Sequence, residues 1–272
     1  MQSWISYHFY PLEASEVFLS RAVKPFLAQY IWPIPGNRAF FVRYEDEKGA
    51  HIRLRLRGEQ AWVEGDLPAA VDGWFAGRGE WSVMPYEPEA ERFGGEVLLA
   101  WAEEHFHVST RVVLERMSQE AYTHGDAMFD ALRMQLITVF VAGLDKAAAG
   151  RYFGQLSAQW LPLFFRPIDH EGPLPADFVE GVNDKFEASY TKQQAQLQAV
   201  LQKLWDSLAS GKFDAKHPEW LRWYRGNELI LKGFEDQLEK VLPSLLHLTN
   251  NRLGINNQDE VFLAYVLGRA LS

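Results

Sequence analysis

The segment at residues 50–58 (AHIRLRLRG) constrains the fold most, because apolar and cationic side chains alternate along it. Successive side chains of a β-strand point to opposite faces, so this period of two predicts a strand. Its apolar face would be formed by Ile52, Leu54 and Leu56. Its other face would be formed by His51, Arg53, Arg55 and Arg57, and we name these four residues the cationic face.

The cationic face is unexpected in a chain whose formal net charge is −9 at pH 7. This acidic balance argues against broad nucleic-acid binding, which needs a basic surface. Arginine suits bidentate binding of carboxylates, so we expect the cationic face, joined by Arg43 from the preceding segment, to bind an anion. The alternative is a solvated edge strand whose arginines pair with surface carboxylates. A central strand would weigh against it, because four neighbouring cations repel one another unless an anion offsets them.

Composition narrows the class of protein further. The 272 residues are 47% apolar, which is enough to bury a sizeable core. The chain has no cysteine, no run of apolar residues long enough for a membrane helix, and no signal-peptide pattern at its start, so we expect a cytoplasmic protein. Its histidines lack metal-ligand spacing and no glycine-rich phosphate-binding motif is present, so we expect neither a metal nor a cofactor.

The N-terminal third predicts elements in the order strand, helix, strand, strand, helix, strand. They are residues 4–10, 15–30, 39–44, 51–57, 68–76 and 81–86. This is the order of a ferredoxin-like sheet, in which the third strand is central. Pro25 should disturb the first helix, because proline cannot donate a backbone hydrogen bond.

After Gly94 and Gly95, almost every segment has the apolar period of an amphipathic helix. The predicted helices are residues 96–106, 109–121, 127–144, 147–163, 178–210, 228–248 and 259–271. We therefore expect an α+β fold. A ferredoxin-like sheet subdomain, residues 1–93, would pack on a mostly helical subdomain, residues 94–272, with a cleft between them.

Residues 86–95 (YEPEAERFGG) form a second stretch of interest, at the junction of the two predicted subdomains. An acidic turn leads to Arg92, and the glycine pair that follows could admit a substrate backbone. The alternative is a linker with a solvated arginine.

Residues 245–255 (LLHLTNNRLGI) form a third such stretch. His247 ends an apolar helix and precedes a helix-stop sequence that contains Asn251, Arg252 and Gly254. A single histidine in this setting is more often a hydrogen-bonded packing residue than a catalyst, so both interpretations stay open.

Together these stretches resemble the glutamate-elimination domain of class I lantibiotic dehydratases, also called the thiopeptide-type bacteriocin biosynthesis domain. The similar motifs are FFVRY (40–44), HIRLR (51–55), YEPE (86–89), ERFGG (91–95), His247, NRLG (251–254) and Tyr265. They span nearly the whole chain in the expected order. One departure is Val108, where the family often has aspartate before a serine; Ser109 could still cap the next helix.

The resemblance implies a lyase of RiPP biosynthesis, the pathway class that modifies ribosomally made peptides. Such an enzyme eliminates glutamate from glutamylated Ser and Thr of a precursor peptide and leaves dehydroamino acids such as dehydroalanine. Because 272 residues leave no room for a glutamylation domain, a separate tRNA-dependent glutamylation protein would act in trans. No direct nucleic-acid partner is expected, and a homodimer stays open.

The resemblance also implies residue roles. The catalytic residues would be Arg53, Arg55, Arg92 and His247, with His247 as base or acid. The substrate-binding residues would be Arg43, His51, Asn251 and Arg252. Two other functions stay open, namely a pyridine-forming [4+2] cycloaddition enzyme of a thiopeptide pathway and a non-catalytic subunit that binds the precursor peptide.

Overall fold

The computed structural model describes residues 1–167, 172–213 and 217–272 of the chain. The chain divides into two compact units. Unit 1 comprises residues 1–123 and 232–254, and unit 2 comprises residues 124–231 and 255–272. This division differs from the one expected after residue 93, because two helices that follow residue 93 belong with the sheet.

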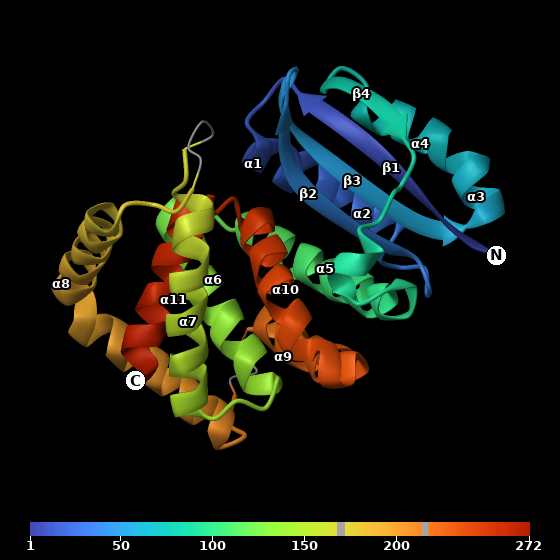
Figure 1. Ribbon diagram of the computed structural model, residues 1–272. Helices are drawn as coiled ribbons and strands as arrows, with labels where there is room; N and C mark the ends of the chain where they lie inside the picture. The colour runs from blue at the N-terminus through green and yellow to red at the C-terminus, as the bar shows by residue number, and fades with distance from the viewer. Residues whose placement is uncertain (168–171, 214–216) are drawn as a thin grey trace. The chain divides into compact units, whose positions relative to one another are not determined.

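Unit 1 contains an antiparallel sheet with the strand order β2-β3-β1-β4 (Figure 1). Its strands are β1 (Gln2–Pro11), β2 (Arg38–Asp46), β3 (Gly49–Glu59) and β4 (Gly79–Met84). The segments that connect them include α1 (Ser15–Phe18), η1 (Leu19–Val23), α2 (Lys24–Tyr30), α3 (Gln60–Glu64) and α4 (Asp66–Phe75). The predicted α+β fold is confirmed, and β3, the third strand, is an inner strand of the sheet.

The apolar face of β3 lies in the core of unit 1. Its residues Ile52, Leu54 and Leu56 are at most 1% exposed. Phe9 of β1 lies directly opposite Ile52, and its ring is 4.5 Å from that of Phe75 on α4. A slip of one residue would exchange the two faces of the strand, so this aromatic packing fixes which side chains of β3 face outward from the core.

The first helix is disturbed where Pro25 predicts it. A π-helical turn, η1, separates α1 from α2, and Pro25 is the second residue of α2. Because proline has no backbone N–H, the regular α-helical hydrogen-bond pattern cannot continue through this position. The predicted helix over residues 15–30 is therefore a succession of three short segments.

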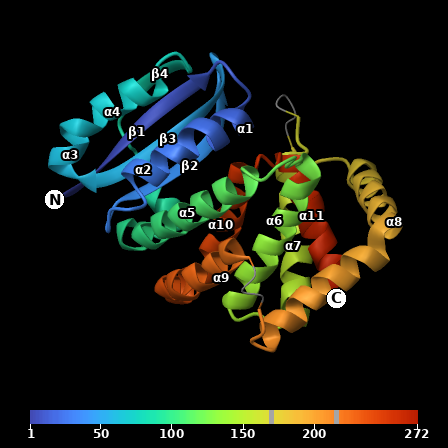
Figure 2. The same cartoon turned by 180° about the vertical axis from the view of Figure 1, so that it is seen from behind.

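Two longer helices of unit 1, α5 (Glu96–Met117) and α10 (Leu238–Leu253), pack against β2 (Figure 2). The ring of Phe106 on α5 lies 5.1 Å from that of Phe40 on β2. The predicted break between residues 106 and 109 is wrong, because α5 is continuous there. The Ser109 hydroxyl donates to the Phe106 carbonyl within the helix, so it does not cap a new one.

The predicted helix over residues 228–248 is also wrong. The chain forms α9 (Pro218–Ile230), then the 3-10 segment η3 (Leu231–Gln237), and then α10. Glu235 in η3 has a φ of 47°, a left-handed conformation through which a right-handed helix cannot continue. Instead of ending near His247, α10 continues to Gly254, whose φ of 79° forms the left-handed cap that glycine tolerates.

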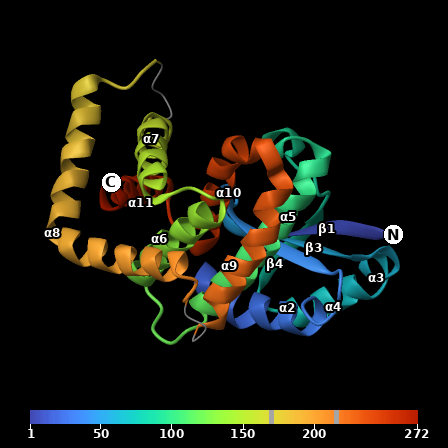
Figure 3. The same cartoon turned by 90° about the horizontal axis from the view of Figure 1, so that it is seen from below.

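Unit 2 is helical in the part of the chain that the structure describes. Besides α9, its helices are α6 (His124–Val141), α7 (Lys146–Phe164), α8 (Ala176–Ala209) and α11 (Asn257–Leu271). α11 packs along α7 (Figure 3), and a Cβ atom at Gly268 of α11 would lie only 2.9 Å from the backbone nitrogen of Gly154 on α7. Glycines therefore allow this close approach. Over the described residues, no helix is long and apolar enough to cross a membrane.

Candidate functional site

The side chains of the cationic face share one side of β3, as the alternation predicts. Residues directly opposite one another in an antiparallel pair lie on the same face, so Ser6 of β1 and Phe40 of β2 flank Arg55 there. His51 is buried and the three arginines are half-buried. The alternative of a solvated edge strand is excluded, because β3 has a neighbour on both sides.

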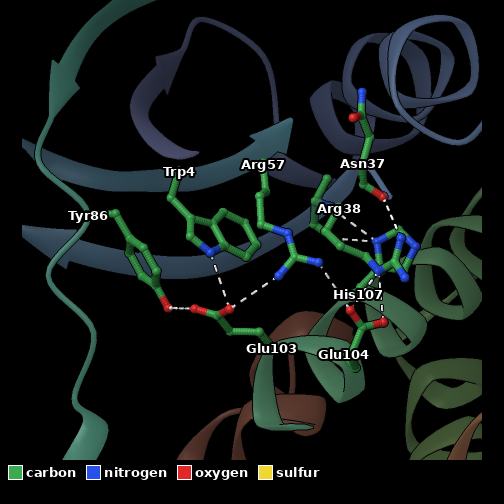
Figure 4. Close-up of polar contacts among 9 residues, drawn as sticks. Trp4, Asn37, Arg38, Arg57, Tyr86, Glu103, Glu104 and His107 are labelled. Carbon is green, nitrogen blue, oxygen red and sulfur yellow. Dashed lines mark hydrogen bonds and ion pairs between the residues drawn. The ribbon is translucent and has the colours of Figure 1, made fainter. Parts of the chain in front are cut away.

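At one end of the cationic face, Arg57 is met by acidic residues of α5 (Figure 4). Its Nη2 lies 3.3 Å from Glu104 Oε1 and its Nη1 lies 3.8 Å from Glu103 Oε2. Glu104 also accepts from Arg38 Nε at 2.7 Å. The positive charge of Arg57 is therefore offset within the protein.

Glu103 is the buried member of this acidic pair, and it accepts two further hydrogen bonds (Figure 4). Trp4 Nε1 donates to it at 3.2 Å and the Tyr86 hydroxyl donates at 2.9 Å. Burial raises the pKa of Glu103, while its hydrogen bond from Tyr86 and the charge of Arg57 act in the opposite direction. Glu103 thus fixes Tyr86 at the edge of the cationic face.

Arg55 differs from Arg57 because no carboxylate pairs with it among the described residues. Its guanidinium carbon lies 5.2 Å from the ring centre of Phe40 and 5.0 Å from that of Tyr86. Its Nε is buried without a hydrogen-bond partner in the described part of the chain. Burial lowers the pKa of Arg55, which means that its positive charge is poorly compensated.

Arg252 of α10 brings a second uncompensated cation to the same place. Its side chain is fully buried, 4.7 Å from the ring centre of Phe106 and 5.7 Å from that of Phe40. Nη1 donates to the Leu248 carbonyl at 2.8 Å, whereas Nε and Nη2 have no partner among the described residues. Burial, and secondarily the charge of Arg55, lowers the pKa of Arg252 to about 9. An anion here would be stabilised by both guanidinium groups.

Arg53 precedes Arg55 by two residues along β3, whereas Arg57 follows it. Uncharged groups orient the Arg53 side chain. Its Nε donates to His51 Nε2 at 3.1 Å, and its guanidinium carbon is 3.4 Å from the ring centre of Tyr44. His8 of β1 lies opposite Arg53 on the same face. Burial, followed by the charge of Arg53, lowers the pKa of His8 to about 4, so His8 adds no charge near neutral pH.

Arg43 does not join the cationic face, and that expectation is wrong. It lies opposite Ile52, so its side chain is on the other side of the sheet. Its Nη1 pairs with Glu16 at 2.8 Å and its Nε donates to the Arg252 carbonyl at 3.2 Å. Arg43 therefore ties β2 to α1 and to the end of α10.

Asn251 holds α10 against the edge of the sheet. The backbone N–H of Arg43 donates to Asn251 Oδ1 at 2.9 Å, and Asn251 Nδ2 donates to the Arg43 carbonyl at 3.0 Å. The side-chain amide thus pairs with β2 as a neighbouring strand would. This contact places Arg252, the next residue, beside Phe40.

Arg92 and His247 lie along another part of α10. Arg92, in η2 (Ala90–Phe93), donates from Nε to the Ser244 hydroxyl at 3.0 Å and pairs with Glu89 at 3.1 Å. His247 is half-buried one turn after Ser244, on the same side of α10. Arg92 and His247 therefore share one side of α10, and Arg55 lies near Arg252.

Sequence reasoning missed several residues of this site, above all Glu103. Its signal was present, because Leu99, Glu103 and Phe106 are spaced as one face of a helix, and a carboxylate among core positions requires partners. Among the described residues, no group of three or more histidines, aspartates or glutamates could hold a metal ion.

The family of the chain follows from a match to a family model. Residues 4–271 match the model described as "Lantibiotic biosynthesis dehydratase C-term". The chain belongs to this family. The predicted resemblance is thereby confirmed, and the chain is assigned to the biosynthesis of ribosomally made, modified peptides. No curated protein matches the sequence.

Solved structures of lantibiotic dehydratase-type proteins share the fold. The pyridine synthase TbtD from thiomuracin biosynthesis has a TM-score of 0.75 and 14% identity, covering 98% of this chain and 97% of that chain. TsrL has a TM-score of 0.68 and 18% identity, covering 99% and 94%. The tRNA-dependent lantibiotic dehydratase MibB from Microbispora sp. 107891 has a TM-score of 0.64 and 20% identity, covering 97% of this chain and 27% of that chain.

Tyr265, which we grouped with the family-like motifs of the sequence, lies in unit 2. Its hydroxyl donates to Glu187 at 2.5 Å, and Arg269 pairs with the same carboxylate at 3.0 Å. These contacts join α11 to α8. The structure thus gives Tyr265 a packing role within unit 2.

Proposed function

We propose that this protein is a lyase that eliminates glutamate from glutamylated Ser and Thr residues of a ribosomal precursor peptide. The observation that carries the proposal is the pair Arg55 and Arg252. Both guanidinium groups lie beside Phe40, and neither pairs with a carboxylate among the described residues. Preorganised cations that lack a counter-ion suit a reaction in which negative charge develops on the substrate.

The elimination has two places where negative charge develops. A base removes the Cα proton, the electron pair forms the Cα–Cβ double bond, and the Cβ–O bond breaks so that glutamate leaves as a carboxylate. Charge therefore develops on the carbonyl oxygen next to Cα and on the departing carboxylate. Arg55 would stabilise this charge, with Arg252 behind it, and each such donor commonly contributes a few kcal/mol.

His247 is the residue that we propose for proton transfer, with Arg92 bound to Ser244 one turn earlier on α10. A neutral imidazole can accept a proton and an imidazolium can donate one, which suits proton transfer to and from the substrate. Arg92 is more exposed than Arg55 or Arg252 and already pairs with Glu89, so it would help to orient the peptide or its glutamyl group. His51 and Arg53 would complete the binding of that group.

The proposed reaction requires a glutamylated peptide as its substrate. We therefore propose that a separate, tRNA-dependent glutamylation protein acts before this one, in the cytoplasm, on the same precursor. The similarity to MibB, a tRNA-dependent lantibiotic dehydratase, supports a tRNA-dependent step before the elimination. The elimination itself requires neither a metal nor a cofactor.

The test is mass spectrometry of a precursor peptide incubated with its glutamylation protein, glutamyl-tRNA and this protein. Elimination removes the glutamyl group and leaves a residue that lacks one water relative to the original Ser or Thr. We expect dehydrated peptide only when this protein is present. If the glutamylated peptide persisted in the presence of folded protein, the proposal would be overturned.

A second candidate is a pyridine-forming [4+2] cycloaddition, because TbtD, a pyridine synthase, is similar over almost its whole length. It would act on a peptide that is already dehydrated, so incubation with such a peptide separates the two reactions. A non-catalytic peptide-binding subunit would convert neither substrate. In that case, substitution of Arg55 would weaken peptide binding without leaving a glutamylated intermediate.

A further inference from the structure

The Arg53 guanidinium group contacts two aromatic rings of the sheet, and one of them accepts a hydrogen bond from it. Its Nε donates to His51 Nε2, and its guanidinium carbon lies over the Tyr44 ring, 3.4 Å from the ring centre. Its two terminal nitrogens have no hydrogen-bond partner in the described part of the chain. The side chain is only half-buried, so a ligand can reach these nitrogens. They are therefore fixed in direction and available to a ligand.

The contact with Arg53 determines the protonation of His51. An arginine Nε can only donate, so His51 Nε2 must accept and carry no proton. The proton of the neutral ring is then on Nδ1, which donates to the Gly49 carbonyl at 3.2 Å. Asp46 Oδ2, 3.7 Å from Nδ1, favours the proton at that nitrogen.

The ring of His51 is also held in place by its neighbours. It is 1% exposed and lies 4.7 Å from the Tyr10 ring and 5.4 Å from the rings of His8 and Tyr44. Rotation of the ring would displace these contacts. His51 thus presents Nε2 to Arg53 from a fixed position on the sheet.

We propose that His51 is a positioning residue, which holds Arg53 so that its two terminal nitrogens bind the free side-chain carboxylate of the glutamyl group. This inference rests on the function proposed above. A tRNA carries an amino acid through its α-carboxyl group, so the ester formed from it leaves the side-chain carboxylate free. A planar carboxylate matches two parallel guanidinium N–H donors, and binding is strongest when the guanidinium is already oriented.

The proposal gives Arg53 and Arg55 different kinetic roles. The side-chain carboxylate carries its charge before and during the reaction, so binding it contributes equally to the ground state and the transition state. Loss of that contact should raise KM and leave kcat nearly unchanged. Arg55 acts on charge that develops only during elimination, so its loss should lower kcat.

The test compares two esters of one short synthetic peptide, in which a single Thr is esterified by the α-carboxyl group of glutamate or of glutamine. His51→Leu removes the acceptor and His51→Gln supplies an amide oxygen in its place. We expect His51→Leu to lower kcat/KM for the glutamyl ester about tenfold, through KM, with little effect on the glutaminyl ester. His51→Gln should restore part of the difference.

A purely structural role for His51 would lower kcat/KM equally for both esters, and that result would overturn the proposal. So would an unchanged preference for the glutamyl ester in His51→Leu. Circular dichroism and thermal unfolding of each variant show whether it is folded.

A second measurement on the wild-type protein does not depend on the variants. The nitrogen-15 chemical shift of His51 Nε2 should be that of an unprotonated imidazole nitrogen, and a protonated Nε2 would overturn the proposal. If the wild-type protein eliminated neither ester, the proposed function would fail, whereas this shift would still decide whether His51 accepts from Arg53.

Discussion

The Arg57 end and the Arg55 position of the cationic face differ in how the protein offsets positive charge. Arg57 is met by two carboxylates of α5, whereas Arg55, two residues earlier, lies beside another arginine. The same residue type in the same alternating pattern thus forms a structural ion pair at one position and an uncompensated cation at the other. Such a cation lowers stability unless an anion joins it, so Arg55 marks where a ligand is expected.

The largest effect is expected for Arg55→Gln. If Arg55 stabilises developing charge, the variant should stay folded but eliminate glutamate on the order of a hundredfold more slowly, as when one donor of an oxyanion site is removed. Glutamylated peptide should then accumulate in place of dehydrated peptide, and mass spectrometry distinguishes the two.

Arg57→Gln is the matched control, because it removes the same charge from the same strand and face. Its effect on the elimination rate should be much smaller, since Glu103 and Glu104 already offset that charge. If Arg57→Gln slowed elimination as much as Arg55→Gln, the two arginines would not differ in their role in the reaction. A normal rate in folded Arg55→Gln would show that the cationic face is not the catalytic surface.

The next largest effect is expected for Arg252→Met, a substitution that keeps a long apolar side chain beside Phe40 and Phe106. The elimination rate should fall about tenfold, equivalent to about 1.4 kcal/mol, because Arg252 adds positive potential behind Arg55. The free energy of unfolding should stay the same or rise, because a buried and unpaired charge is removed.

Urea unfolding measures the stability of Arg252→Met. A large decrease in the free energy of unfolding would show that Arg252 holds the fold together, through its bond to the Leu248 carbonyl, and would place it with Arg57 as a structural residue.

The alternation in residues 50–58 was sufficient to predict β3 and both of its faces, because each follows from the period of a strand. The placement of Arg43 could not be predicted in the same way. Which residues of a hairpin lie opposite one another depends on the length of its turn. Asp46 pairs with Gly49 across a two-residue loop, and this register sets Arg43 opposite Ile52 on the apolar side.

The sequence also could not predict that carboxylates offset the charge of Arg57. Its partners Glu103 and Glu104 are over 40 residues away, and they meet Arg57 only because α5 is one continuous helix that packs against the sheet. The sequence suggested a break near residue 108. Long-range charge pairing depends on tertiary packing, which local patterns do not encode.

A smaller effect, on stability and not on rate, is expected for Glu104→Gln. Arg38 and Arg57 both pair with Glu104, and the side chains of Arg38 and Glu104 are each 27% exposed. Loss of the charge should lower the free energy of unfolding by about 1 kcal/mol. Glu89→Gln is the control, because Glu89 is 70% exposed and its pair with Arg92 should contribute less than about 0.5 kcal/mol.

Chemical unfolding of both variants tests this difference, together with their elimination rates. Glu104→Gln should lower the free energy of unfolding and leave the elimination rate unchanged. An elimination rate that falls in Glu104→Gln as far as in Arg55→Gln would show that the paired end also takes part in the reaction.

A further effect, on the pH dependence of stability, is expected through His107 of α5. The Ala39 N–H donates to its Nδ1 at 3.1 Å, and burial, followed by the charge of Arg38, lowers the pKa of His107 from 6.5 to about 4. Between these two values the unfolded chain binds a proton that the folded protein does not. Stability contributed by the neutral ring is therefore complete above about pH 6.5 and is lost as the pH falls toward about 4.

His107→Gln should reduce the slope of unfolding free energy against pH within that window. His8 contributes in the same direction, since its pKa is also lowered to about 4, so the slope should diminish without vanishing. Urea unfolding of the wild type and of His107→Gln across this pH range makes the comparison. An unchanged slope in His107→Gln would mean that His107 is protonated in the folded protein within this pH range. Two neighbouring positive charges, on His107 and Arg38, would then be offset by Glu104.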